Sequence, residues 1–365
     1  MATIANDDVN GQGAGPNAGQ RDLLFVIDPP DTLKPAKDSS IAMMRELARR
    51  GYGIWVCTPR ELSWHSSARS GLWEPTGGHG GVRALALPIG LAPVAPPGAP
   101  GGGDAWFTPA RSAEPRGLDG FAAVLMRKDP PFDSEYLYAT HLLGAAMRTG
   151  ARVFNDPAAL RNHNEKLAIT EFTAFIAPTV VTGDPEEILA FQRDQGEIVV
   201  KPLDGMGGSG IFRLSPGDPN TNAILEAVTI EGTRTVMAQR FLPAIAQGDK
   251  RILLIGGQPV PYALARVPKA GESRGNLAAG GTGYARELTQ RDREIAESLG
   301  PILDARGLLL VGLDVIGDHL TEINVTSPTC FVEITQQSGF DVAAAFADAL
   351  EQRLAATAQR LESAS

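Results

Sequence analysis

The stretch Lys201-Pro202-Leu203-Asp204-Gly205-Met206-Gly207-Gly208-Ser209-Gly210 decides the fold class. It lies between apolar runs at 198–200 and 211–214, so we expect it to join two strands. Its glycines let successive backbone N–H groups converge on one anion, and the lysine adds a positive charge that suits a phosphate. The stretch is neither a Walker loop nor a dinucleotide fingerprint, because no Gly-Lys-Ser/Thr and no helix follow. A plain β-hairpin with a flexible tip remains the alternative.

A second segment, 314–324 (DVIGDHLTEIN), is typical of a β-hairpin with its turn at 317–319. A three-residue turn places Asp314 opposite Glu322, and Asn324 shares their face by the period of two. Opposed carboxylates repel each other unless a cation lies between them, and such oxygen ligands suit Mg²⁺. We therefore expect these three residues to bind a metal ion. A solvated acidic edge is the alternative, and a two-residue turn would put the two carboxylates on opposite faces.

A third segment, 271–283, is too rich in glycine and alanine to pack a core, and it suits a mobile lid. Arg274 in its middle is placed to bring a positive charge to a reacting phosphoryl group, and we group it with Arg251 and Arg266, which precede the segment. The alternative is a disordered surface loop with an incidental arginine. Together, the three segments favour phosphoryl chemistry with a nucleotide and Mg²⁺.

The composition sets wider limits. The chain has 365 residues, enough for two or three domains, and its net charge of −9 argues against a general nucleic-acid binder. No run of about 18 apolar residues predicts a membrane helix. The polar segment 1–20 lacks the apolar core of a secretory signal and is typical of a disordered tail. We expect Cys57 and Cys330 to be free thiols and the protein to be cytoplasmic.

The first part of the chain alternates strands and helices. Strands at 23–27 and 54–57 flank a helix at 41–50, whose start is capped by the segment 38–40. This βαβ unit predicts a parallel sheet within a first domain, 21–155. Further expected elements are a strand at 122–126, a helix at 134–148, a strand at 152–154 and a Gly/Pro-rich insertion at 87–103.

The remainder changes character. A helical stretch at 157–175 is followed by strands and glycine-rich loops up to Thr326. Helices at 222–230 and 290–306 interrupt them, and a final helix is expected at 341–362. The fold class is therefore mixed α/β.

Together with Lys166, these motifs resemble the ATP-grasp ligases, and within that superfamily the bacterial glutathione synthetases. Matching strings occur in the family's order and cover nearly everything from Leu24 to about Leu354. The strings are KDSS (37–40), MRKDPPFD (126–133), NEKL (164–167), KPLDGMGG (201–208), GDKR (248–251), RGNLAAGG (274–281) and TEINVTSPT (321–329).

The resemblance implies an ATP-grasp fold preceded by a Rossmann-like domain. A lid domain (156–240) and a C-terminal domain (241–358) would hold ATP between two sheets, with a mobile loop at 267–283. The reaction would ligate γ-glutamylcysteine to glycine through an acyl-phosphate, using ATP and Mg²⁺, with Mn²⁺ as a substitute. A homotetramer without nucleic-acid or membrane partners is also implied.

The resemblance assigns residues to roles. ATP would be bound by Lys166, Lys201, Asp204, Gly205, Met206, Gly207, Gly208, the hinge residues Gln239, Arg240, Phe241 and Leu242, and Asp249. The dipeptide and acyl-phosphate would face Arg251, Arg266 and Arg274, with further substrate contacts from Asp38, Ser39, Ser40, Arg127 and Ser327. The metal ligands would be Asp314, Glu322 and Asn324.

The sequence departs from the family pattern at the tail 1–20, at the insertion 87–103, at hinge residues 240–241 and at Thr282, where an arginine is familiar. Two other functions stay open. One is an ATP-grasp ligase that joins a carboxylate to a different amine, and the other is a non-catalytic nucleotide-binding module.

Overall fold

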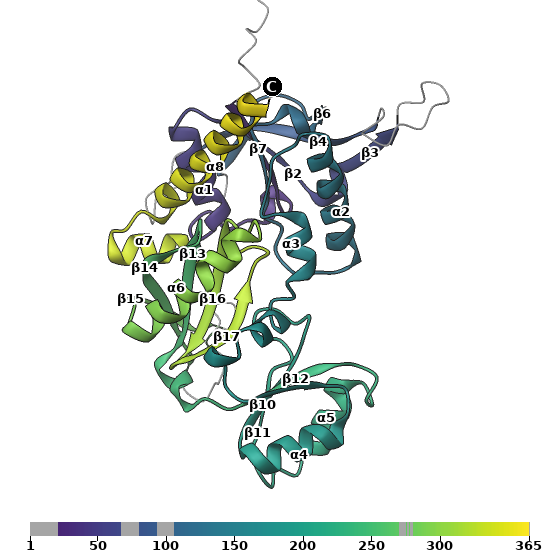
Figure 1. Cartoon of the computed structure of the whole chain (residues 1–365), viewed down its shortest axis with the longest axis vertical. Helices are drawn as coiled ribbons and strands as arrows, with labels where there is room; N and C mark the ends of the chain where they lie inside the picture. The colour runs from purple at the N-terminus through teal and green to yellow at the C-terminus, as the bar shows by residue number, and fades with distance from the viewer. Residues whose placement is uncertain are drawn as a thin grey trace, which may run out of the picture.

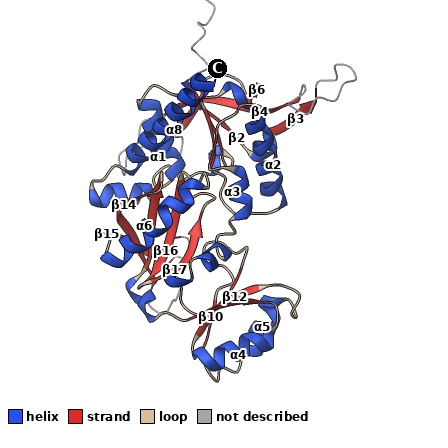
Figure 2. Cartoon of the chain, viewed as in Figure 1, coloured by secondary structure: helices blue, strands red, loops and turns tan. Residues whose placement is uncertain are grey.

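The computed structural model describes residues 21–66, 80–92, 106–269, 275, 277 and 280–364. Three sheets organise this part of the chain (Figure 1). Helices and strands mix throughout it, which confirms the α/β class (Figure 2). None of the described helices is long and apolar enough to cross a membrane.

The N-terminal sheet has the strand order β3-β4-β2-β1-β7-β8. Its central strands pair in parallel, as the βαβ pattern predicts. The strands are β1 (Asp22–Val26), β2 (Gly53–Cys57), β3 (Leu62–Ser66), β4 (Gly80–Leu91), β7 (Ala123–Met126) and β8 (Val153–Phe154), with β5 (Phe107–Pro109) and β6 (Glu114–Gly117) paired to β4. The helices α1 (Ser39–Arg49) and α2 (Ser134–Arg148) begin after the side-chain caps Asp38 and Asp133.

The predicted insertion at 87–103 is wrong at its start, because 87–91 belong to β4 and pair with β2 and β5. The prediction took Pro88 as the end of the strand, because proline has no backbone N–H to donate. Its carbonyl oxygen still accepts a hydrogen bond from Ala110 N at 2.9 Å, so Pro88 fits within β4. Residues 93–103 lie outside the described part, as does the predicted tail at 1–20.

The middle sheet is antiparallel, with the order β11-β10-β12-β9. Its strands are β9 (Thr179–Thr182), β10 (Ile198–Pro202), β11 (Phe212–Leu214) and β12 (Val236–Arg240). Helices α4 (Pro185–Gln195) and α5 (Thr221–Thr229) lie together on one face, where Ile188 and Leu225 join the buried core.

The long helix predicted at 157–175 is wrong. The chain instead forms α3 (Pro157–Asn162) and two 3₁₀ turns, Leu167–Glu171 and Thr173–Phe175. The side chain of Asn164 accepts bonds from the backbone N–H groups of Lys166 and Leu167, and such local bonds compete with a continuous helix.

The C-terminal sheet is antiparallel, with the order β15-β14-β13-β16-β17. Its strands are β13 (Asp249–Ile255), β14 (Gln258–Val267), β15 (Thr282–Glu287), β16 (Leu310–Ile316) and β17 (His319–Asn324), and its helix α6 spans Gln290–Ala305. Val267, Thr282 and Gly283, which we assigned to the mobile loop, lie in paired strands.

Two helices end the chain, where one was predicted. The missed helix α7 (Phe331–Ser338) starts directly after the Ser-Pro-Thr turn, and its N-cap Cys330 has a left-handed φ of 86°. Helix α8 (Val342–Ala364) packs against α1, where Arg50 binds Asp348 and Glu351 (Figure 1). The last helix therefore returns to the N-terminal layer, and the predicted domain boundaries stay a prediction.

Candidate active site

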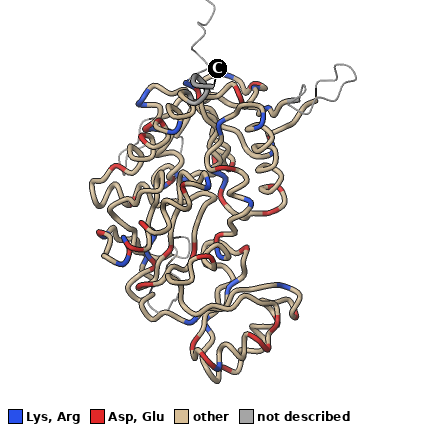
Figure 3. Tube along the Cα trace, viewed as in Figure 1, with Lys and Arg blue, Asp and Glu red and all other residues tan. Residues whose placement is uncertain are grey.

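A cavity of about 320 Å³ lies where the middle sheet meets the C-terminal sheet. Its lining includes both basic and acidic residues. Figure 3 shows lysines and arginines interspersed with acidic residues along the part of the chain that is drawn in colour. Most of the predicted site residues line this cavity, although they come from distant parts of the sequence. They are Lys166, Lys201, Gly205, Met206, Gly207, Gly208, Gln239, Arg240, Phe241, Leu242, Asp249, Arg251, Arg266, Asp314, Glu322, Asn324 and Ser327.

The predicted substrate contacts of the N-terminal layer lie behind the cavity wall. Ser40 Oγ accepts from Arg127 Nε at 3.0 Å, and Ser39 Oγ accepts from Phe331 N at 3.2 Å. Arg127 also donates to the carbonyl of Pro328, at 2.8 Å. These side chains therefore support the turn that carries Ser327 rather than lining the cavity.

Two other predicted residues are not part of the cavity wall as described. Asp204 is exposed and pairs with Arg234, away from the cavity lining. Arg274 lies outside the described residues.

The metal-site hairpin reaches the predicted pairing by a different route. Its turn has two residues rather than three, because Ile316 pairs with His319. A β-bulge at Thr321 then adds one residue to β17, so Asp314 lies opposite Glu322 after all. Asn324 follows two positions later on the same face, and its Nδ2 donates to Gly312 O at 3.3 Å.

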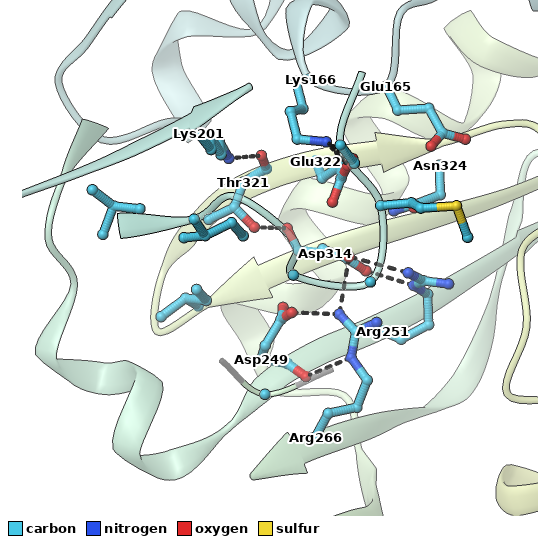
Figure 4. Close-up of a pocket in the computed structure, with 18 of the residues that line it drawn as sticks. Glu165, Lys166, Lys201, Asp249, Arg251, Arg266, Asp314, Thr321, Glu322 and Asn324 are labelled. Atoms are coloured by element: carbon cyan, nitrogen blue, oxygen red, sulfur yellow. Dashed lines mark hydrogen bonds and ion pairs between the residues drawn. The ribbon is translucent and has the colours of Figure 1, made fainter. Parts of the chain in front are cut away.

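A row of alternating charges crosses the C-terminal sheet (Figure 4). Arg251 Nε and Nη2 bind the two oxygens of Asp314 at 2.5 and 3.1 Å. Arg266 Nη2 lies 2.9 Å from Asp314 Oδ2 and 2.5 Å from Asp249 Oδ2. The cations therefore offset the repulsion that the Asp314–Glu322 pair would otherwise suffer.

Burial and these cations set the protonation of the two aspartates. Burial alone would raise the pKa of Asp314, but Arg251 and Arg266 outweigh it and hold that pKa below its ordinary value. Burial raises the pKa of Asp249 against the pull of Arg266. Among the described residues, the Oδ1 atom of Asp249 is buried without a hydrogen-bond partner, so it is available to a ligand in the cavity.

Two lysines face this row from the other side. Lys166 Nζ lies 3.0 Å from Glu322 Oε1 and donates to Gly205 O at 2.6 Å. Lys201 Nζ donates to Thr321 O at 3.0 Å, and its burial lowers its pKa to about 8. The glycine loop follows Lys201, and the left-handed φ of Gly207 (61°) disfavours a side chain there.

Sequence reasoning missed several cavity residues. Glu165, Thr326 and Cys330 all line the wall. Glu165 stands beside Lys166 in a family-like string, a signal that could have found it. Cys330 is buried, and burial raises the pKa of its thiol, which keeps it in the unreactive protonated form.

Comparison with known proteins decides the family. The description "Prokaryotic glutathione synthetase, N-terminal domain" matches residues 22–161, and "Prokaryotic glutathione synthetase, ATP-grasp domain" matches residues 165–339. The chain belongs to the prokaryotic glutathione synthetase family. It is thus an ATP-dependent ligase of glutathione synthesis that uses a divalent metal and small-molecule substrates.

Curated glutathione synthetases resemble the ligase over nearly their whole length. The protein from Ralstonia nicotianae is 55% identical over 90% of this chain and 95% of its own length. The protein from Bordetella parapertussis is 56% identical over 90% of this chain and 98% of its own length. The protein from Nitrosomonas europaea is 54% identical over 91% of this chain and 98% of its own length.

Solved structures support the fold alone, because their identities are low. The D-cycloserine synthetase DcsG is 17% identical, with a TM-score of 0.58 over 91% of this chain and 99% of its own. A RiPP-associated ATP-grasp ligase from Chryseobacterium gregarium is 15% identical, with a TM-score of 0.57 over 91% of this chain and 97% of its own. The ATP-grasp fold predicted from the sequence is therefore confirmed.

Proposed function

We propose that the ligase joins γ-glutamylcysteine to glycine through an acyl-phosphate, releasing ADP and phosphate. The observation that carries this proposal is the cavity, where lysines and a glycine loop face a row of carboxylates and arginines. Such a site suits a nucleotide triphosphate, its metal ion and a second anionic substrate.

The chemistry explains the need for these charges. A carboxylate is a poor electrophile, so its oxygen first attacks the γ-phosphorus of ATP and ADP leaves. The glycine amine then attacks the acyl carbon and loses a proton as phosphate departs. Phosphoryl transfer depends on positioning and charge neutralisation, which Lys166, Lys201, Arg251 and Arg266 can supply from their cavity positions.

We assign the nucleotide to the middle-sheet side of the cavity. Lys166, Lys201 and the loop 204–208 would hold phosphates, and the hinge 239–242 would offer backbone groups to the adenine. The Oδ1 atom of Asp249 is buried and has no hydrogen-bond partner in the described part of the chain, which supports its assignment to a ribose hydroxyl.

We assign the divalent ion to Asp314, Glu322 and Asn324. Their oxygens lie on one face of the hairpin, and all three line the cavity. Oxygen donors favour a hard cation, so we propose Mg²⁺, with Mn²⁺ as a substitute. The bound ion would neutralise charge on the transferring phosphoryl group.

We assign the dipeptide and acyl-phosphate to Arg251, Arg266, Arg274 and Ser327. Arg127 and the segment 38–40 would support this end of the cavity. The buried guanidinium of Arg127 supports this assignment, because it donates hydrogen bonds to the neutral oxygens of Ser40 and Pro328 and so brings a positive charge to this end of the cavity. The loop at 268–281 would close over the intermediate and exclude water, since an acyl-phosphate hydrolyses readily.

One assay tests the proposal against its alternatives. The enzyme is incubated with Mg·ATP and γ-glutamylcysteine, glycine or another amine is added, and ADP release is followed. We expect release that depends on glycine. Release with another amine alone would select a different carboxylate–amine ligase, and no release with any acceptor would select a non-catalytic nucleotide-binding module.

The same assay checks the metal. Chelation with EDTA should abolish ADP release, and Mg²⁺ should restore it, with Mn²⁺ restoring it at least in part. Full activity in excess EDTA would contradict the assignment of Asp314, Glu322 and Asn324.

We also propose a homotetramer in the cytoplasm and the division 21–155, 156–240 and 241–358. The family resemblance supports the tetramer and the division. The use of ATP and the two unpaired cysteines support the location. Light scattering coupled to size-exclusion chromatography tests the tetramer.

A further inference from the structure

Glu165 binds the backbone at the end of β17, the strand that carries the proposed metal ligands Glu322 and Asn324. Figure 4 shows Glu165 close to Asn324. Its Oε1 accepts three hydrogen bonds, from Val325 N at 2.9 Å, Thr326 N at 3.1 Å and Thr326 Oγ1 at 2.8 Å. Its backbone carbonyl accepts a fourth, from Ile323 N at 2.8 Å. Glu165 therefore binds the backbone N–H groups of Ile323 and Val325, the residues on both sides of Asn324.

The neighbours of Glu165 reach the opposite sheet. Asn164 Nδ2 donates to the carbonyl of Leu203 at 3.2 Å, at the start of the glycine loop. Lys166 Nζ binds both Gly205 O in that loop and the carboxylate of Glu322. Three consecutive residues, 164–166, thus tie the phosphate-binding side of the cavity to its metal-binding side.

We propose that Glu165 is a positioning residue that sets the distance between the glycine loop and the metal ligands Glu322 and Asn324. This inference rests on the proposed ATP and metal site. Glu165 acts through hydrogen bonds to the backbone and to Thr326, so its effect should appear in metal use and turnover rather than only in stability.

The test compares Glu165→Ala with Glu165→Gln in the ADP-release assay. Alanine removes the three side-chain bonds, and we expect kcat to fall and the half-saturating Mg²⁺ concentration to rise, each by about 10- to 100-fold. Glutamine keeps an acceptor oxygen in the same place, so we expect both values within about fivefold of the unaltered enzyme.

Asp156→Ala is the matched control. Asp156 Oδ1 also accepts two backbone N–H bonds, from Ala158 and Ala159, on the same connecting segment but outside the cavity wall. The Asp156→Ala variant should have a lower melting temperature and an unchanged half-saturating Mg²⁺ concentration. Equal Mg²⁺ requirements in Glu165→Ala and Asp156→Ala would overturn the inference, as would a glutamine variant as impaired as the alanine variant.

A milder change covers the case in which Glu165→Ala does not fold. Thr326→Val removes only the hydroxyl bond to Glu165, and we expect it to raise the half-saturating Mg²⁺ concentration about threefold. An unchanged requirement there would also overturn the inference. The unaltered enzyme is measured alongside, so its failure to release ADP would count against the proposed reaction rather than against Glu165.

Discussion

Gly312 shows how space at a single residue controls the charged row. It pairs with Asn324 across the hairpin and lies on the metal face, two positions before Asp314. A Cβ atom there would lie 2.8 Å from Arg251 Cδ, 3.1 Å from Arg251 Nε and 3.3 Å from Pro328 Cβ. The missing side chain at 312 therefore makes room for the guanidinium that holds Asp314.

We predict that Gly312→Ala displaces Arg251, lowers kcat by about tenfold or more, and costs about 1–3 kcal/mol of stability through overpacking. Initial rates and urea unfolding measure the two effects. Gly81→Ala is the control, because a Cβ at Gly81 in β4 meets no atom within 4 Å. Unchanged kcat in Gly312→Ala would contradict this account of Arg251.

At the residue scale, most residues that the sequence singled out line the cavity, some through their local chemistry and others, such as the hinge 239–242, through the family resemblance. Lysines, glycines and carboxylates in fixed strings signal their own roles. Glu165 could not be placed in the same way, since its partners at 323–326 lie about 160 residues further along the chain. No local period links two segments so far apart.

At the element scale, helix α1 depends on Glu46. Arg49 Nε and Nη2 both donate to this carboxylate at 2.7 Å, and Arg50 Nε donates to it at the same distance. Hydrogen bonds from Arg49 lower the pKa of Glu46 to about 2, against burial and with help from Arg50. Arg50 also forms an ion pair with Glu351 of α8. By binding Arg50, Glu46 therefore stabilises the contact between α1 and α8.

We predict that Glu46→Gln lowers stability at neutral pH by roughly 1–3 kcal/mol. The folded pKa lies below the ordinary value of 4.5, so the contribution of Glu46 is complete above about pH 4.5 and is lost as pH falls toward 2. Urea unfolding between pH 7 and pH 3 should therefore show a shrinking difference between variant and unaltered protein.

A difference that is constant over this range would contradict that account. Glu114→Gln provides the control, because Glu114 makes an exposed pair with Arg111 and its loss should cost less than about 1 kcal/mol.

Elements with strong periods and caps were predicted well. Helix α2 has the predicted limits, and α1 begins after its predicted cap at Asp38. Helix α7 was missed because a proline-containing turn hides its start, and the break after α3 was missed because Asn164 bonds locally. The second error arises where a side chain competes with regular backbone bonding.

At the scale of the whole molecule, Asn155 ties the N-terminal layer to the C-terminal sheet. Its Nδ2 donates to the carbonyls of Leu310 and Val325, each at 2.8 Å, and its Oδ1 accepts from Leu310 N at 3.0 Å. The N–H group of Val325 donates a hydrogen bond to Glu165. Two segments of the connecting chain thus hold one strand end.

We predict that Asn155→Ala leaves these buried backbone groups unpaired and destabilises the protein by roughly 2–4 kcal/mol. Denaturant unfolding measures the loss, and faster hydrogen exchange at Leu310 N would locate it. Asn220→Ala is the control, since Asn220 caps α5 without a side-chain bond. Equal stabilities of the two variants would show that the tie is unimportant.

The composition marks the change from the βαβ pattern of the first part to strands and glycine-rich loops, whereas the three-part division comes from the family resemblance and stays a prediction. The sequence did not predict that α8 returns to α1. That packing pairs the beginning of the chain with its end, and only the folded structure brings Arg50 to Glu351.

The bulge at Thr321 affects how relatives should be aligned. The two-residue turn and the one extra residue in β17 cancel each other, so an insertion or deletion at 317–318 preserves the metal face only when a second one occurs near Thr321. Gaps in this hairpin should therefore be placed in pairs. A single unpaired gap would match Glu322 with a residue on the opposite face of the sheet.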